Sequence, residues 1–248
     1  MAHEAVIVSG VRSAIGDFGG ALAGVPPTEL AATVSREAIR RAGIEADAVG
    51  MSVFGNVIHT EPKDMYLSRV AAISAGVPET SPALTLNRLC GSGLQAVVTA
   101  AEAILLGNAE VALAGGAESM SRAGHLNTVA RFGQKMGDVR VIDMMVGALS
   151  DPFGHGHMGI TAENVADRYQ LTREEQDALA LASHTRAAEA IEAGRFKEQI
   201  LPIAVKKGRQ EVEFDTDEHV RPGLAAADLE KLRPAFRKDG RVTAGNAS

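Results

Sequence analysis

The sequence contains a single cysteine and no tryptophan, and aromatic residues make up only 4% of its 248 residues. One cysteine excludes an intrachain disulfide framework and a cysteine-rich metal cluster. No apolar run approaches the roughly 20 residues that a membrane-spanning helix needs. The N-terminus carries Glu4 and lacks the basic region of a secretory signal. We therefore expect a reduced, cytoplasmic protein without a membrane partner.

Neither sign of charge is in large excess, since the formal net charge is −6. This acidic balance argues against nucleic acid or an anionic membrane surface as the main partner. Hydrophobic residues make up 46% of the chain and charged residues 23%, as in ordinary globular proteins. With few aromatic side chains, the core must consist of Ala, Val, Leu, Ile and Met. The 26 glycines and abundant alanines favour closely packed helices and sheet over an all-β sandwich.

Apolar periodicity predicts alternating strands and helices in the first half of the chain. Strands are expected at residues 5–9, 51–57, 83–86 and 110–114, and helices at residues 29–42, 65–75 and 93–106. This alternation predicts an α/β layer with much parallel pairing. The length is sufficient for one or two domains with a substantial core.

The pattern changes after about residue 118, where Met, Gly and Arg are frequent and regular periodicity is lost. A long helix is expected at residues 173–193, because Thr172 and Glu175 can form a capping box. A hairpin is expected at residues 205–214 and a strand at residues 241–248. A final strand without a polar tail predicts that the chain is a fragment; the alternative is a protein that ends in a strand.

The sole cysteine, Cys90, follows a predicted strand and stands at the start of the most regular predicted helix. The positive end of the helix dipole favours the thiolate, which is the nucleophilic form of cysteine. Gly91 and Gly93 carry no side chain and leave room for a bulky substrate. These features predict a nucleophile, and the alternative is an inert core cysteine.

The same residues allow a different interpretation. Gly91, Gly93 and Ala96 match the G-x-G-x-x-G/A dinucleotide fingerprint between a strand and a helix. Glu118 follows the next predicted strand, where an acidic residue could bind ribose. The fingerprint usually occupies the first strand–helix turn of its fold, whereas at least two such units precede it here. An NAD(P) site is therefore the weaker hypothesis.

Five segments together resemble the thiolase family. They are NRLCGSGLQA at residues 87–96, GGAESMS at 115–121, HMGITAENVA at 157–166, LRPAF at 232–236 and VTAGNAS at 242–248. The first is similar to the acyl-enzyme cysteine motif, and the third to a block of the biosynthetic branch. Residues 53–69 resemble bacterial β-ketothiolases linked to polyhydroxyalkanoate synthesis.

The resemblance implies a thiolase-like α/β fold. Residues 1–118 plus 241–248 would form the N-terminal α/β domain, and residues 119–240 a loop domain for coenzyme A binding and oligomerisation. A similar C-terminal half, absent from this sequence, would carry a catalytic Asn, a catalytic His and a second catalytic Cys. None of the three can be identified here. The only cysteine is Cys90, and none of the seven histidines stands in the Gly-His-Pro context of the catalytic His.

The activity implied is that of an acetyl-CoA C-acetyltransferase, or β-ketothiolase. Cys90 would take an acetyl group from acetyl-CoA, and a second acetyl-CoA would condense with it to give a 3-ketoacyl-CoA, acetoacetyl-CoA. The coenzyme A thioesters are substrates, so no resident cofactor is expected. We expect this polypeptide alone to be close to inactive. The alternative is a non-catalytic thiolase-like protein that binds acyl-CoA or a partner chain.

The resemblance also implies a set of coenzyme A contacts. These are Leu149, His157, Met158, His184, Arg221, Phe236 and Ser248. Pattern alone would place Leu149 and Phe236 in a core and leave His184 and Arg221 on a solvated surface. His155 and His157 could form half of a metal site, but no third ligand lies nearby, so no metal is expected.

The segment 125–143 corresponds to the tetramerisation hairpin of biosynthetic thiolases. Its apolar residues are Phe132, Met136, Val139, Val141 and Ile142. The resemblance therefore implies a homo-oligomer, a dimer or a tetramer in the full-length protein. The alternative is a plain surface hairpin.

Overall fold

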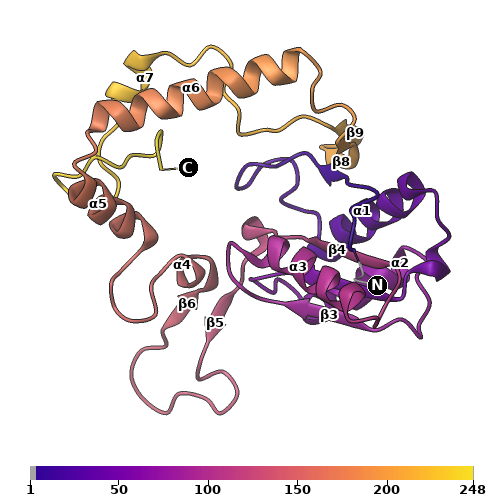
Figure 1. Cartoon of the computed structure of the whole chain (residues 1–248). Coiled ribbons are helices and arrows are strands. Elements are labelled where there is room, and N and C mark those ends of the chain that lie inside the picture. The colour runs from indigo at the N-terminus through magenta and orange to yellow at the C-terminus, as the bar shows by residue number, and fades with distance from the viewer. Residues whose placement is uncertain (1–3, 248) are drawn as a thin grey trace. The chain divides into compact units, whose positions relative to one another are not determined.

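The computed structural model describes residues 4–247 and divides into two compact units (Figure 1). The first unit comprises Met1–Met145 and Glu198–Glu218, and the second comprises Val146–Lys197 and His219–Ser248. The domain boundaries implied by the resemblance, at residues 118 and 240, remain a prediction.

A parallel three-stranded sheet lies at the centre of the first unit. Its strands are β2 (Met51–Gly55), β3 (Ala83–Leu86) and β4 (Ala112–Gly116), in the order β3-β2-β4. Gly55 of the central strand is level with Leu86 on one side and with Gly116 on the other. All three strands therefore end at one edge of the sheet. The expected α/β class with parallel pairing is confirmed.

Helices pack against both faces of this sheet. The helices of the first unit are α1 (Pro27–Ala42), α2 (Leu67–Ser74) and α3 (Ser92–Leu105). Phe54 packs in a core cluster with residues of α1 and α2, whereas its neighbour Val53 packs with Ala96 and Ala100 of α3. Consecutive strand residues point to opposite faces, so β2 supplies both cores. Small alanines fill much of each interface, as the composition predicts.

Short elements complete the first unit. A β-hairpin joins β5 (His125–Asn127) to β6 (Val141–Asp143), and a second joins β8 (Ile203–Lys207) to β9 (Gln210–Phe214). A two-residue parallel pair joins β1 (Arg12–Ser13) and β7 (Ile200–Leu201). Three 3₁₀ turns cover Ala46–Ala48, Pro62–Tyr66 and Met120–Arg122, and α4 (Met144–Ala148) follows β6.

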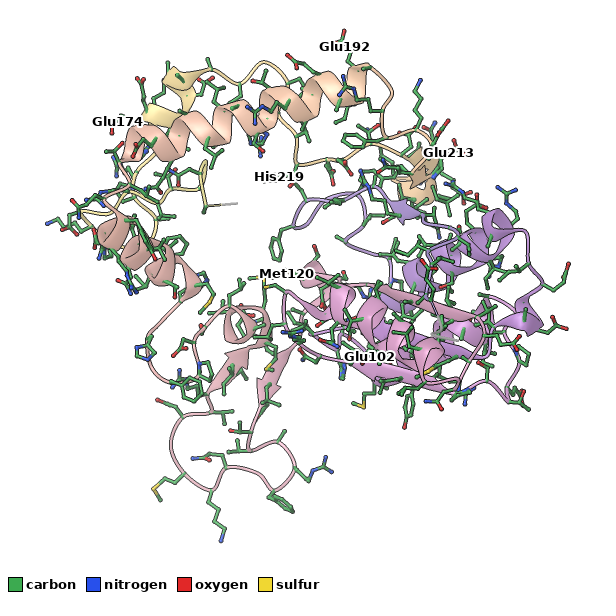
Figure 2. The ribbon with its side chains drawn as sticks, viewed as in Figure 1. Glu102, Met120, Glu174, Glu192, Glu213 and His219 are labelled. Carbon is green, nitrogen blue, oxygen red and sulfur yellow. The ribbon has the colours of Figure 1, made fainter. Side chains whose placement is uncertain are left out.

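The second unit is helical. It contains α5 (Met158–Tyr169), α6 (Arg173–Glu192) and α7 (Ala226–Glu230). Figure 2 shows Glu174 and Glu192 at opposite ends of α6. The expected capping box is present, because Thr172 Oγ1 accepts from the Glu175 N–H (3.1 Å) and the Glu175 carboxylate accepts from the Thr172 N–H (2.8 Å). Among the described helices, none has the length and apolar character to cross a membrane.

Two expected strands are wrong. Residues 5–9 form no strand; Val6, Ile7 and Val8 are 66%, 82% and 68% exposed, because β-branched residues suit a strand only when a neighbouring edge pairs with it. The described part of 241–248 forms a turn and one isolated bridge, between Thr243 and Pro234, but no strand. There Thr243 Oγ1 accepts from the Gly245 N–H, and Asn246 Oδ1 accepts from the Thr243 N–H. These local side-chain bonds compete with a strand ladder.

Candidate active site

Cys90 is exposed and lies between the end of β3 and the first residue of α3, Ser92. Gly91 is the residue that flanks the helix start. The first backbone N–H groups of a helix have no carbonyl partner within it, and they give this end a partial positive charge. The thiol is therefore accessible and lies at the leading turn of a helix, as the sequence predicts. A cysteine buried in the core is excluded.

The chain bends sharply immediately before Cys90. Leu89 has a φ of +49°, a left-handed conformation that costs a non-glycine residue about 1 kcal/mol. Two polar side chains hold the bend. Asn87 Oδ1 accepts from the Leu89 N–H at 2.9 Å. Buried Ser92 accepts from the Arg88 N–H at 2.8 Å and donates to the Leu89 carbonyl at 2.7 Å.

Cys90 stands out in the sequence, whereas the roles of Asn87 and Ser92 emerge only from the structure. A signal for both was present, because Asn and Ser commonly bond to backbone groups two or three residues away in tight turns. The two side chains fix the loop on each side of the thiol and thereby its direction.

Glycines at the strand ends allow α3 to begin directly against the sheet. A β-carbon on Gly55 would lie 2.6 Å from the β-carbon of Ser92, and one on Gly116 would lie 3.2 Å from the Gly55 carbonyl oxygen. Gly93 instead faces open space, with no atom within 4 Å of an added β-carbon. The expected room beside Cys90 is therefore present on the Gly93 side.

In the second unit, the start of α5 brings four of the expected coenzyme A contacts together. The Met158 N–H donates to the Leu149 carbonyl at 2.8 Å. His157 caps α5, since its Nδ1 accepts from the Gly159 N–H at 3.0 Å. The His157 ring stacks on Phe236 with centroids 5.0 Å apart. An accepting Nδ1 leaves the proton of a neutral ring on Nε2, where it can be donated.

Gly159 explains how Phe236 reaches this position. A β-carbon on Gly159 would lie 2.3 Å from the Phe236 ring, so the ring lies directly on the helix backbone. Phe236 and Leu149 are half-buried, and Met158 is 42% exposed. The four residues are therefore partly accessible to solvent: they are neither fully buried in the core nor fully exposed.

A second pair of expected contacts meets at α6. The Arg221 N–H donates to His184 Nδ1 at 3.2 Å, and the His219 ring lies 5.8 Å from the His184 ring. Partial burial lowers the pKa of His184, and the charges of His219 and Arg221 lower it further. Ser248, the remaining contact of the set, lies outside the described residues.

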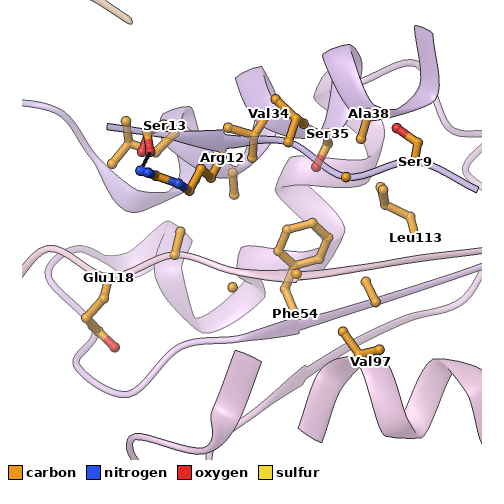
Figure 3. Close-up of a pocket in the computed structure, with 18 of the residues that line it drawn as sticks. Ser9, Arg12, Ser13, Val34, Ser35, Ala38, Phe54, Val97, Leu113 and Glu118 are labelled. Carbon is orange, nitrogen blue, oxygen red and sulfur yellow. Dashed lines mark hydrogen bonds between the residues drawn. The ribbon is translucent and has the colours of Figure 1, made fainter. Parts of the chain in front are cut away.

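The first unit contains a cavity of about 1050 Å³, lined by the segment Ala5–Phe18 and by residues of α1, α3 and β4. Figure 3 shows Glu118 away from the apolar side chains of Val34, Ala38 and Leu113. Cys90 is not among its lining residues. The cavity is therefore separate from the predicted nucleophile.

Glu118 holds a loop of the first unit. Its carboxylate accepts from the Val57 N–H at 2.8 Å, from the Ile58 N–H at 3.1 Å and from Asn56 Nδ2 at 3.2 Å. Burial raises the pKa of Glu118, and the two backbone bonds oppose that rise. Because the carboxylate already binds three N–H groups, the geometry disfavours a ribose-binding role and with it the dinucleotide hypothesis.

The apolar residues of the segment 125–143 are accessible. Phe132 is 93% exposed and Met136 is 87% exposed, on the connection between β5 and β6. Within the described residues, no group of three His, Cys, Asp or Glu side chains is placed to hold a metal ion.

Comparison with known proteins gives the family. Residues 5–248 match the family model described as the thiolase N-terminal domain. The chain is 60% identical over 249 aligned positions to the β-ketothiolase BktB of Cupriavidus necator and 49% identical over 248 to an acetyl-CoA acetyltransferase of Pseudomonas aeruginosa. It covers 63% of the length of each relative, and they cover 100% and 99% of the chain.

Solved structures agree. The crystal structure of the Bacillus anthracis acetyl-CoA acetyltransferase matches with a TM-score of 0.94 and 47% identity, over 98% of this chain and 62% of that one. Human mitochondrial 3-ketoacyl-CoA thiolase in complex with CoA matches with a TM-score of 0.91 and 37% identity, over 98% of this chain and 62% of that one.

Proposed function

The chain belongs to the thiolase family, and we propose that it provides the acyl-accepting cysteine and part of the coenzyme A site of an acetyl-CoA C-acetyltransferase. The observation that carries this proposal is the exposed Cys90 at the leading turn of α3. A thioester can reach such a thiol, and the helix end favours negative charge beside it.

The first half-reaction follows from this geometry. The Cys90 sulfur attacks the carbonyl carbon of acetyl-CoA, and a new carbon–sulfur bond forms while negative charge moves to the carbonyl oxygen. Backbone N–H groups near the start of α3 are the proposed donors to that oxygen, because such donors stabilise a developing oxyanion. When the carbonyl reforms, the bond to coenzyme A breaks and the coenzyme A thiolate leaves and takes up a proton.

For coenzyme A itself we propose two subsites in the second unit. The half-buried residues at the start of α5, with the stacked pair His157 and Phe236, suit the pantetheine arm and the acyl end. The exposed Arg221 beside His184 suits the phosphate and adenine end, since a guanidinium pairs with phosphate. Ser248 completes the proposal as a pantetheine contact.

The second half-reaction needs groups that these 248 residues do not supply. A base must take a proton from the α-carbon of a second acetyl-CoA, and the resulting carbanion must attack the acetyl-cysteine and release the Cys90 thiolate. The sequence has one cysteine, so a second thiol cannot be that base. Loss of even one oxyanion donor costs about 3 kcal/mol. We therefore propose that this polypeptide alone accepts an acetyl group but does not turn over.

A competing function is binding of acyl-CoA without acyl transfer. Mass spectrometry of the purified chain after incubation with acetyl-CoA distinguishes the two. Acetyl transfer predicts a single added acetyl group on Cys90 in the wild type and none in Cys90→Ala. Coenzyme A binding without the adduct would refute the transfer proposal and support the competing function.

We also propose a homo-oligomer that uses the exposed apolar side chains between β5 and β6. Phe132 and Met136 are nearly fully exposed, which is unusual for large apolar residues unless a partner covers them. Sedimentation velocity tests this proposal. The double substitution Phe132→Ser and Met136→Ser is expected to shift the chain toward monomer, and a wild type that is already monomeric at all concentrations would contradict it.

A further inference from the structure

Glu163 is a fully buried carboxylate in the middle of α5, with 0% of its surface exposed. It accepts hydrogen bonds from two consecutive backbone N–H groups. The Arg241 N–H lies 3.0 Å from both carboxylate oxygens, and the Val242 N–H lies 2.9 Å from Oε1. The Arg237 guanidinium lies 3.6 Å from Oε2. A charge this deeply buried is tolerated only when such partners satisfy it.

The backbone opposite Glu163 leaves space for the carboxylate. A β-carbon on Gly240 would lie 2.1 Å from Glu163 Oε1 and 2.8 Å from its carboxyl carbon. Gly240 does not adopt a left-handed φ, so any residue could take its backbone conformation. The requirement for glycine at this position is therefore the space that Glu163 occupies.

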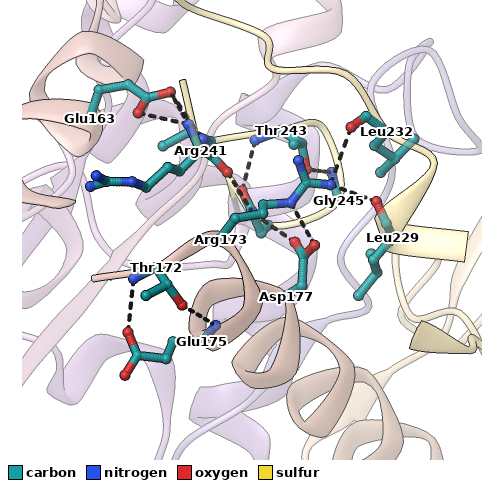
Figure 4. A network of polar contacts seen from close by, with 12 residues as sticks. Glu163, Thr172, Arg173, Glu175, Asp177, Leu229, Leu232, Arg241, Thr243 and Gly245 are labelled. Atoms are coloured by element: carbon teal, nitrogen blue, oxygen red, sulfur yellow. Dashed lines mark hydrogen bonds and ion pairs between the residues drawn. The ribbon is translucent and has the colours of Figure 1, made fainter. Parts of the chain in front are cut away.

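The segment that Glu163 binds is also held from α6 (Figure 4). Asn246 Nδ2 donates to Asp177 at 2.8 Å and to the Arg241 carbonyl at 3.1 Å. Arg173 pairs with the same Asp177 and donates to the Leu229 and Leu232 carbonyls. Residues 237–247 contain no described helix or strand. The N–H groups of Arg241 and Val242 have the Glu163 carboxylate as their partner, and that of Thr243 has Asn246 Oδ1.

Glu163 thus connects two parts of the proposed coenzyme A site. The helix that carries Glu163 begins at His157 and Met158, six and five residues earlier in the chain. The Glu163 carboxylate binds the backbone of the segment that follows Phe236. The ring of Phe236 lies against His157 and the Gly159 backbone. If residues 237–247 move, Phe236 can move with them, and the contact between the Phe236 and His157 rings is lost.

We propose that Glu163 is a positioning residue for coenzyme A binding, which holds residues 237–247 in a fixed position relative to the start of α5. This inference rests on the proposed function, because it assumes that the site at α5 receives coenzyme A. Glu163 does not touch the ligand in this proposal and acts through the backbone of Arg241 and Val242.

The test uses the whole 248-residue chain and coenzyme A in isothermal titration calorimetry. Glu163→Gln keeps the shape but turns an amide N–H₂ toward backbone N–H groups, and we expect affinity to fall about tenfold or more. Asp228→Asn is the control. Asp228 lies on α7, outside residues 237–247, and its side chain is 52% exposed. It pairs with Lys231 and accepts from the Ala225 N–H, so its replacement should change the affinity less than about twofold.

A spectroscopic readout separates positioning from general destabilisation. The imidazole NMR signals of His157 report the Phe236 ring stacked on it, and Glu163→Gln should shift them while Asp228→Asn leaves them in place. Gly240→Ala provides a second variant, since its methyl group displaces the carboxylate without removing it. Gly240→Ala should lower the affinity for coenzyme A and shift the His157 signals in the same way. It therefore tests the proposal even if Glu163→Gln does not fold.

The outcomes are distinguishable. A wild type that does not bind coenzyme A would overturn the proposed function. Wild-type binding with unchanged affinity and unchanged His157 signals in Glu163→Gln or Gly240→Ala would overturn the positioning role alone.

Discussion

Replacement of Ser92 by alanine should affect the reactivity of Cys90 without any change to the sulfur itself. The Ser92 hydroxyl makes two hydrogen bonds across the bend, at 2.8 Å to the Arg88 N–H and at 2.7 Å to the Leu89 carbonyl. A net contribution of about 1 kcal/mol per bond gives a loss of about 2 kcal/mol in the free energy of unfolding. Without the hydroxyl, Leu89 can leave its left-handed conformation, and Cys90 then moves away from the start of α3.

The interaction of a charge with a helix terminus is worth about 0.3–1 kcal/mol, so the rate of Cys90 alkylation at neutral pH should fall about threefold. Iodoacetamide labelling followed by mass spectrometry measures this rate. Because Cys90 is the only cysteine, every labelled chain reports this thiol. Urea unfolding of the same samples measures stability.

Ser68→Ala is the matched control. Ser68 on α2 is also buried, and its hydroxyl donates to the hydroxyl of Ser52 on β2 at 3.1 Å. This variant should lose about 1 kcal/mol of stability and keep the wild-type labelling rate. Equal labelling rates in Ser92→Ala and the wild type, together with the expected loss of stability, would refute the argument that the bend orients the thiol.

Two further predictions concern the fold. Thr172→Ala removes half of the capping box of α6 and should lower stability by about 1 kcal/mol in thermal or urea unfolding, whereas unchanged unfolding would show that the box contributes nothing. The hydrogen-bonded Arg12 guanidinium lowers the pKa of Asp217 below its ordinary value of 3.8. The ion pair between Asp217 and Arg12 therefore stabilises the fold fully above pH 3.8, and this stabilisation is lost as the pH falls through the lowered pKa of Asp217. Asp217→Asn should make the free energy of unfolding depend less on pH in the acid range.

Local sequence patterns predict much of the central sheet and the helix that carries Cys90. The expected strand at 83–86 is Ala83–Leu86, and the expected helix at 93–106 is Ser92–Leu105. The apolar period locates α3 but not its buried face, because Ala96, Ala100 and Ala103 are buried whereas Leu94, Val98 and Leu105 are exposed. The capping box of α6 is predictable, since both partners lie within one helical turn.

The two wrong strands show where local reasoning fails. Residues 5–9 have the composition of a strand, but a strand also requires a neighbouring edge, which no local pattern encodes. Residues 241–247 have a β-branched start, yet Thr243 and Asn246 bond to nearby backbone N–H groups and close turns instead. Turn-forming side chains therefore outweigh propensity in that segment.

The same contrast between local and distant signals applies to the candidate site. The position of Cys90 at a helix start is predictable, because the cysteine, the glycines and the start of α3 lie within a few residues. Glu163 is not predictable from pattern, since its partners Arg241 and Val242 lie 78 and 79 residues away in the chain. From the sequence alone, a glutamate inside a helix is expected to be exposed to solvent. Only the folded chain places the N–H groups of Arg241 and Val242 beside the Glu163 carboxylate.

One structural device recurs at the loops that carry the proposed chemistry. Each lacks a strand ladder or helix, and a side-chain oxygen binds its backbone N–H groups instead: Ser92 at the Cys90 bend and Glu163 at residues 241–242. Such a bond defines one loop conformation, while the surrounding hydrophobic cores supply most of the stability. Substitutions at these buried polar residues should therefore change reactivity or coenzyme A affinity before they unfold the protein, whereas substitutions in the alanine-rich cores should do the reverse.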